Sequence, residues 1–207
     1  MTESLGEILF VKPKINSASL VEEKAQIRCQ MRSLLERVSP ASRSAASETL
    51  VRQLLRTERY RWAEAIGMYV ATGWEIDLGE AMLAGLDQKK RMAVPRWNGG
   101  TAEYEFALID RLSELVNGQF GIREPHADCP RIEGNQLDLV LIPGLAFSCN
   151  GVRLGRGKGF YDRLLREVRG HRCGVAYEFQ LVEMLPADLW DQRVESIVTP
   201  RHWIEPE

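Results

Sequence analysis

The apolar run at residues 137–142, LDLVLI, constrains the fold more than any other feature of the chain. A strand whose side chains are apolar almost without interruption is buried on both faces, which is typical of a parallel sheet covered by helices. Further strands are predicted at residues 65–70, 91–94, 104–108, 172–176 and 196–199. We expect Pro95 to end the strand at 91–94, because proline cannot donate a hydrogen bond to a sheet ladder.

Helical patterns alternate with these strands. Apolar residues recur at helical spacing over residues 22–38, and Ser39–Pro40 is typical of an N-cap followed by a first-turn proline in a second helix that ends near Leu55. Two more helices are predicted at residues 76–86 and 160–168. The alternation predicts an α/β fold, a single-domain layered structure with a mostly parallel central sheet flanked by helices.

The length and composition limit the classes of function. A chain of 207 residues without an internal repeat or linker fits one domain, which we expect to span residues 20–207 after a variable N-terminal leader at residues 1–19. The formal net charge of -2 argues against nucleic acid or an anionic membrane surface as a partner. No run approaches the roughly 18 apolar residues of a membrane span, and the leader lacks the pattern of a secretory signal.

The four cysteines indicate the compartment. They form no C-x-x-C pair, which argues against a zinc site or a disulfide framework and favours a reducing, cytoplasmic setting. We also expect the protein to be a monomer. The cysteines are Cys29, Cys129, Cys149 and Cys173.

Residues 153–162, RLGRGKGFYD, carry the main chemical signal. The alternate glycines Gly155, Gly157 and Gly159 allow consecutive backbone N–H groups to turn inward around an anion, and the loop leads into a predicted helix N-terminus that favours phosphate. Three cations crowd the same loop, and Asp162 offers a hard oxygen ligand for Mg²⁺. The cations are Arg153, Arg156 and Lys158.

A tight turn is the alternative interpretation of these glycines, and on the glycines alone the two are equally good. Three like charges in one loop are costly without an anion, which favours phosphate binding. The spacing is neither that of a Walker A loop nor that of a dinucleotide-binding fingerprint.

Together, P-G-L-A-F at residues 143–147 and G-x-R-L-G-R-G-K-G-F-Y-D at residues 151–162 resemble the signature of the 5-formyltetrahydrofolate cyclo-ligase family, also called 5,10-methenyltetrahydrofolate synthetase. The resemblance extends from about Lys24 to Thr199. It implies an enzyme that uses ATP and Mg²⁺ to cyclise 5-formyltetrahydrofolate to 5,10-methenyltetrahydrofolate, with release of ADP and phosphate.

The resemblance also implies roles for individual residues. Lys24 and Arg28, at i and i+4 on one helix face, match an ATP-binding pair; without the family, a solvated basic flank is the better interpretation. Glu75 matches a folate-binding glutamate, although the start of the helix at 76–86 would also favour an acid there. Val70 matches an apolar contact to the pterin. Asp162 and Asp191 match Mg²⁺-associated aspartates.

The glycine loop supplies the remaining roles. Arg153, Arg156 and Lys158 are the expected catalytic residues, which stabilise the phosphoryl group in transfer. The expected folate contacts are Arg156, Lys158, Phe160 and Tyr161. The expected ATP contacts in the loop are Arg153, Gly155, Arg156, Gly157, Lys158, Gly159 and Tyr161.

Some sequence features leave the roles of their residues open. The segment FGIREP at residues 120–125 resembles a family stretch that borders the substrate pocket, and a rigid turn also explains it. Trp190 stands where many members have histidine, and Pro200 where many have glutamate. Two other functions stay open: an ATP-dependent ligase with another acceptor, and a nucleotide- or folate-binding paralogue without turnover.

Overall fold

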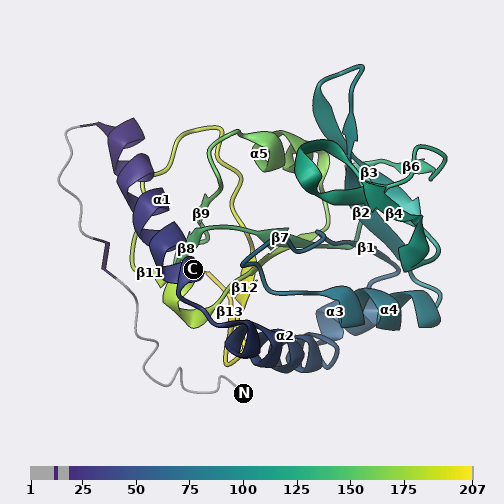
Figure 1. Ribbon diagram of the computed structural model, residues 1–207, viewed down its shortest axis with the longest axis horizontal. Coiled ribbons are helices and arrows are strands. Elements are labelled where there is room, and N and C mark those ends of the chain that lie inside the picture. The colour runs from purple at the N-terminus through teal and green to yellow at the C-terminus, as the bar shows by residue number, and fades with distance from the viewer. Residues whose placement is uncertain (1–11, 14–18, 207) are drawn as a thin grey trace.

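The computed structural model describes residues 12–13 and 19–206 (Figure 1). The expected N-terminal leader, residues 1–19, lies outside the described residues except for 12, 13 and 19. A sheet of eight strands forms the centre, in the order β13-β12-β10-β7-β1-β2-β3-β6. Strands β12, β10, β7, β1 and β2 are parallel to one another, whereas β13, β3 and β6 pair antiparallel at the two sides. The prediction of a mostly parallel sheet is confirmed.

The eight strands differ in length, from two residues in β6 and β13 to eight in β2. Their bounds are β1 Ala65–Gly67, β2 Arg91–Asn98, β3 Glu103–Ile109, β6 Arg131–Ile132, β7 Leu139–Pro143, β10 His171–Val175, β12 Ser196–Val198 and β13 Trp203–Ile204. Two small sheets adjoin the large one. The first has the order β11-β8-β9, with β8 Ala146–Ser148, β9 Arg153–Leu154 and β11 Leu181–Val182; the second pairs β4 Leu115–Asn117 with β5 Arg123–Pro125.

Strand β7 divides the interior into two layers of core. Leu139 and Leu141 belong to the cluster that α1 and α2 cover, whereas Val140 and Ile142 belong to the cluster that includes Leu164 of α5. All five residues of β7 are buried. The expectation that this run is buried on both faces is therefore confirmed.

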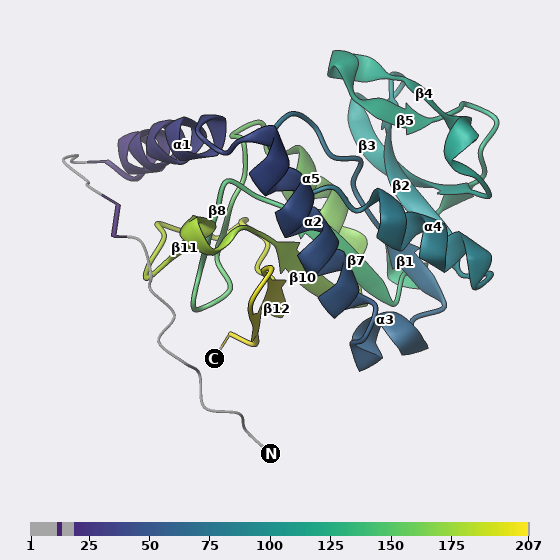
Figure 2. The same cartoon turned by 60° about the horizontal axis from the view of Figure 1, so that its bottom comes forward.

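Helices cover the two faces (Figure 1). Helices α2, α3 and α4 lie together on one side of the sheet and α5 lies on the other, while α1 lies beyond one end of the sheet (Figure 2). No helix within residues 12–13 and 19–206 is long and apolar enough to cross a membrane. The helices are α1 Leu20–Glu36, α2 Pro40–Leu54, α3 Glu58–Trp62, α4 Gly79–Asp87 and α5 Phe160–Leu164.

The start of α2 forms as the sequence predicts. The Ser39 hydroxyl accepts the N–H of Ser42 at 3.1 Å, and Pro40 occupies the first turn. Ser19 caps α1 in the same way by accepting the N–H of Glu22. These side chains satisfy N–H groups that a helix start leaves without a partner.

The prediction that Pro95 ends its strand is wrong. Strand β2 continues to Asn98, and Pro95 pairs with Phe106 of β3. The N–H of Arg91 bonds to Glu64 and the carbonyl of Ala93 accepts from Met68, so alternate residues of β2 face β1. By position 95 strand β1 has ended, and the missing proline N–H leaves no ladder bond unmade.

Three predicted elements are shorter than expected. Strand β1 ends at Gly67, so residues 68–70 continue as a loop. Helix α4 begins at Gly79 instead of residue 76, after the Asp77 side chain accepts the N–H of Gly79. Helix α5 ends at Leu164 and continues as a 3₁₀ turn over Leu165–Glu167.

Candidate active site

A cavity of about 690 Å³ opens where several parallel strands end. In α/β sheets, ligands bind in the crevice beyond the carboxyl ends of the strands. Helix α1, the loop after β1, strands β2 and β3, the glycine loop and the 188–191 loop all contribute to the wall. Every site residue expected from the sequence lines this cavity: Lys24, Arg28, Val70, Glu75, Arg153, Gly155, Arg156, Gly157, Lys158, Gly159, Phe160, Tyr161, Asp162 and Asp191.

The glycine loop passes directly beneath α1. The Arg28 Nε donates to the carbonyl of Gly155 at 3.0 Å, and a Cβ at position 157 would lie 3.4 Å from the Arg28 guanidinium. Gly157 and Gly159 have φ angles of +102° and +65°, which favour glycine. Because α5 has only five residues, its dipole contributes less to anion binding than that of the longer helix we predicted.

Arg153 is buried under the loop. The residue is 5% exposed, and its Nη2 lies 2.7 Å from Asp162 Oδ1 while Nη1 donates to the Pro143 carbonyl at 3.2 Å. Its Nε finds no hydrogen-bond partner in the described part of the chain. The guanidinium also lies over the ring of Tyr161, and burial raises the pKa of that phenol, helped by the charge of Glu75. Arg153 thus ties the glycine loop to the first turn of α5.

Lys24 lies between two carboxylates. Its Nζ is 2.8 Å from Asp188 Oδ2 and 2.5 Å from Asp191 Oδ2, and the Asp188 N–H also donates to Asp191. Burial alone lowers the pKa of Lys24, but hydrogen bonds and charge from both aspartates outweigh it, so the net shift is upward. The two carboxylates share one ammonium, and Asp191 also interacts electrostatically with Arg28.

Glu75 joins the loop after β1 to the glycine loop. Its Oε1 lies 2.7 Å from Arg156 Nη2, and its Oε2 accepts both the N–H and the hydroxyl of Thr72. Arg156 donates to the Thr72 hydroxyl as well, at 2.6 Å. The alternative that Glu75 complements a helix start is wrong, because α4 begins at Gly79.

Four aromatic rings gather at the other side of the cavity. The Lys158 ammonium lies 4.4 Å from the ring centroid of Phe120 and 5.8 Å from that of Phe160. Phe120, Ile122 and Arg123 line the cavity, so the FGIREP segment borders the pocket. It is also a tight turn, since Phe120 and Gly121 have φ angles of +60° and +71°. The four rings are Trp97, Tyr104, Phe120 and Phe160.

Sequence reasoning missed several polar residues of this cavity, among them Thr72, Tyr104 and Asp188. Asp188 lies three residues before Asp191 in a turn without a regular pattern, so its partnership with Lys24 left no signal in the sequence. Trp190, the departure from the family pattern, also lines the cavity and is 61% exposed. Among the described lining residues there is no histidine.

The carboxylates of the cavity suit a metal ion that is bound jointly by the protein and the substrate. Residues 12–13 and 19–206 contain no group of three or more His, Cys, Asp or Glu side chains that could bind a metal unaided. Mg²⁺ commonly binds through one or two carboxylates together with substrate phosphates and water. Asp162 and Asp191 are hard oxygen donors beside the phosphate-suited loop, and this donor set fits Mg²⁺ in that manner.

Comparison with known proteins agrees with this arrangement. The sequence profile of the 5-formyltetrahydrofolate cyclo-ligase family matches residues 20–200. The chain belongs to this family. The resemblance seen in the glycine loop is therefore confirmed, and the matched region includes every residue that lines the cavity.

Relatives support the membership over most of the chain. The 5-formyltetrahydrofolate cyclo-ligase of Haemophilus influenzae is 29% identical over 176 residues, which cover 82% of this chain and 94% of the relative. The solved structure of Aquifex aeolicus 5,10-methenyltetrahydrofolate synthetase has a TM-score of 0.81 at 32% identity, covering 89% of this chain and 93% of that one. A synthetase from Mycoplasma pneumoniae, 24% identical with a TM-score of 0.67 over 86% and 99% of the two chains, shares the fold.

Proposed function

We propose that this protein is a 5-formyltetrahydrofolate cyclo-ligase. It converts 5-formyltetrahydrofolate and ATP to 5,10-methenyltetrahydrofolate, ADP and phosphate with the help of Mg²⁺, and residues 20–207 form the catalytic unit. One observation carries the proposal. A single cavity is lined by the basic glycine loop, by the Glu75 carboxylate and by aromatic rings, so a phosphate donor and a flat acceptor can meet there.

ATP binds along the basic side. Lys24, Arg28 and Lys158 contact its phosphates, together with the backbone N–H groups of Gly155, Gly157 and Gly159. Arg153 supports phosphate binding from beneath the loop, because its ion pair with Asp162 keeps the first turn of α5 in place. Cations and backbone dipoles fixed before substrate arrives stabilise the transferring phosphoryl group without reorganisation.

The folate lies on the opposite side. Glu75 accepts hydrogen bonds from the N–H edge of the pterin, a role that suits a carboxylate. Val70, Phe160 and Tyr161 contact its rings. Since Glu75 already holds Arg156, the same pair orients the folate beside the phosphate loop.

The reaction needs activation of a poor electrophile. The formyl oxygen attacks the γ-phosphorus of ATP, ADP departs, and an iminium phosphate forms at N5. N10 of the same molecule attacks the formyl carbon, loses its proton to solvent, and the C–O bond breaks to release phosphate. Arg156 and Lys158 neutralise the phosphate that departs, and positioning accounts for most of the rate. Asp162 and Asp191 would hold Mg²⁺, which neutralises phosphate charge when it is bound.

A spectrophotometric assay tests the proposal. Purified protein with 5-formyltetrahydrofolate, ATP and Mg²⁺ should produce the absorbance of 5,10-methenyltetrahydrofolate, and omission of ATP should abolish it. ATP binding without this product would contradict the proposal. It would favour a ligase with another acceptor or a paralogue without turnover.

A further inference from the structure

Glu124 is a buried carboxylate that the proposed reaction does not use. The residue lies on β5 and is 4% exposed. Its Oε2 accepts the N–H of Trp97 at 2.9 Å and its Oε1 accepts the hydroxyl of Tyr104 at 3.2 Å. Neither donor is charged, and no ion pair to Glu124 is present among the described residues. A carboxylate buried without a counter-charge depends on such hydrogen bonds.

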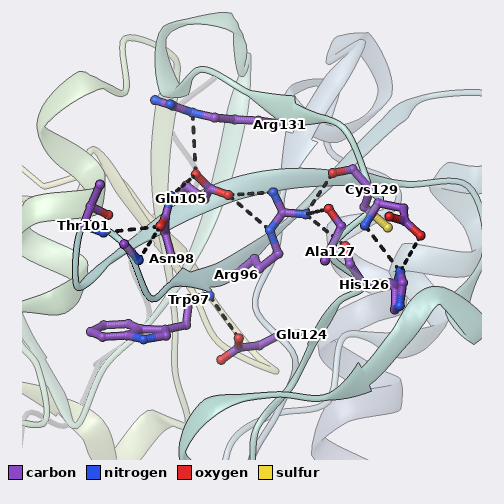
Figure 3. A network of polar contacts seen from close by, with 12 residues as sticks. Arg96, Trp97, Asn98, Thr101, Glu105, Glu124, His126, Ala127, Cys129 and Arg131 are labelled. Atoms are coloured by element: carbon purple, nitrogen blue, oxygen red, sulfur yellow. Dashed lines mark hydrogen bonds and ion pairs between the residues drawn. The ribbon is translucent and has the colours of Figure 1, made fainter.

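The Glu124 carboxylate is hydrogen-bonded to two neighbouring strands at the same level of their ladder. Trp97 of β2 and Tyr104 of β3 are direct partners in the ladder, so Glu124 bridges both from a third strand. Gly118 makes room for it, because a Cβ there would lie 2.5 Å from the Glu124 Cδ. The adjacent Arg96 is held separately: it pairs with Glu105 and donates to the carbonyls of His126, Ala127 and Cys129 (Figure 3).

The two residues that Glu124 holds belong to the aromatic cluster. The Trp97 ring contacts Tyr104, Phe120 and Phe160 edge-on, with centroids 5.3, 5.6 and 5.3 Å away. The latter three line the cavity. Edge-to-face contacts between rings depend on orientation. Fixing the backbone of Trp97 and the hydroxyl of Tyr104 therefore fixes the ring surface that faces the cavity.

We infer that Glu124 is a positioning residue for the folate. Its carboxylate holds Trp97 and Tyr104 so that the aromatic wall presents one set of ring faces and edges to the flat rings of the substrate. The inference rests on the proposed function, since it takes a folate as the occupant of this side. Because the aromatic rings are already ordered before the substrate binds, no binding free energy is lost in ordering them.

The test is the affinity of the protein for 5-formyltetrahydrofolate, measured by isothermal titration calorimetry without ATP. Glu124→Leu leaves the Trp97 N–H and the Tyr104 hydroxyl without their acceptor, and we expect Kd for the folate to rise about tenfold while Kd for ATP stays within about twofold. In Glu124→Gln the carboxamide oxygen accepts from Trp97 and the NH₂ group donates to the Tyr104 oxygen. That variant should stay within about threefold of the wild type.

Glu105→Gln is the matched control. Glu105 is a partly buried carboxylate on β3, with a side chain that is 15% exposed; it holds Arg96 and does not line the cavity. We expect it to lower Tm and leave the folate affinity unchanged. If Glu124→Leu does not fold, Tyr104→Phe replaces it, because that change deletes only the hydroxyl; its Kd for the folate should rise about threefold.

The outcomes separate this inference from the proposed function. A wild type that binds no 5-formyltetrahydrofolate would overturn both. A wild type that binds the folate and turns it over, with unchanged affinity in Glu124→Leu or in the Tyr104→Phe replacement, would overturn the positioning role alone. Equal losses of affinity in Glu124→Leu and Glu105→Gln would also overturn it, because a general loss of rigidity would then explain both.

Discussion

The cations of the cavity differ in how firmly they are already held. Most of them have a fixed oxygen partner, whereas the Lys158 ammonium contacts only the Phe120 and Phe160 rings within the described residues. The Lys158 side chain is also exposed, so its removal would disturb few packing contacts. Among the five cations expected from the sequence, Lys158 is therefore the one most available to a phosphate. The held cations are Lys24 with two aspartates, Arg28 with the Gly155 carbonyl, Arg153 with Asp162 and Arg156 with Glu75.

Replacing Lys158 should separate activity from stability. We expect Lys158→Ala to lower kcat for methenyltetrahydrofolate formation by about 10²- to 10³-fold, as when one preorganised charge contact to a reacting group is removed. Tm should stay within about 1 °C, since the side chain is exposed. Lys90→Ala is the control, because Lys90 also lies over an aromatic ring but not in the cavity. Near-normal turnover in Lys158→Ala would remove Lys158 from the catalytic residues.

At the scale of elements, side-chain bonds join loops that the sheet does not connect. Glu75 and Thr72 come from the loop after β1, and Arg156 comes from the glycine loop after β9. Lys24 similarly joins α1 to the 188–191 loop. The loops that line the cavity therefore keep their spacing through a few charged pairs.

The Glu75–Arg156 pair gives a prediction about the folate. Glu75→Gln keeps the size of the side chain and removes its charge, and we expect KM for 5-formyltetrahydrofolate to rise about tenfold with a smaller change in KM for ATP. Initial-rate kinetics with each substrate varied in turn measure both constants. Glu48→Gln, on the exposed side of α2, is the control. An effect confined to ATP would contradict the assignment of Glu75 to the folate.

The contact between β10 and β12 gives a prediction about pH. His171 Nε2 lies 2.8 Å from Ser196 Oγ, and burial together with the charge of Arg59 lowers the pKa of His171 below its ordinary value of 6.5. His171 therefore binds a proton more readily in the unfolded chain than in the folded one. The resulting stability is present above pH 6.5 and is lost as pH falls through the folded pKa.

Urea unfolding across this range measures the effect. The free energy of unfolding should fall as pH drops below 6.5, and His171→Gln should make that slope flatter. His126→Gln serves as the control, because the His126 side chain is 53% exposed. The same slope in His171→Gln as in the wild type would show that other groups cause the loss.

The elements that sequence patterns missed are those whose partners lie far along the chain. Residues 115–125 carry no alternation, yet they form the β4–β5 hairpin that brings Phe120 against Phe160. Strand β2 continues past Pro95 only because β1 ends first. Neither feature is determined by residues that are neighbours in the sequence. By contrast, the Ser39–Pro40 helix start and strand β7 depend on neighbouring residues, and both were predicted.

At the scale of the whole molecule, the parallel strands bring distant segments to one edge of the sheet. The glycine loop and the i, i+4 pair of Lys24 and Arg28 were visible in the sequence, because spacing within one segment sets their geometry. Asp188 and Tyr104 were not, since only the assembled fold places them beside Lys24 and Glu124. Residues placed by spacing within one segment were thus more predictable than residues placed by the assembled fold.

Removal of metal tests the assignment of the two aspartates. Because Mg²⁺ would be held mainly by ATP phosphates with Asp162 and Asp191, chelation should abolish turnover and leave the Tm of the free protein within about 1 °C. Asp191→Asn should raise the Mg²⁺ concentration needed for half-maximal rate, by about tenfold. Turnover that persists with excess chelator would contradict a role for the metal.

The position of Lys158 has a thermodynamic consequence. Its ammonium rests on the rings of Phe120 and Phe160 while its backbone belongs to the glycine loop. A phosphate that draws this ammonium off the rings changes the surface that a flat second ligand meets. Such coupling is reciprocal: the factor by which ATP alters the affinity for the folate must equal the factor by which the folate alters the affinity for ATP. With ATP and the folate bound as proposed, one side chain would make the binding of each depend on the other.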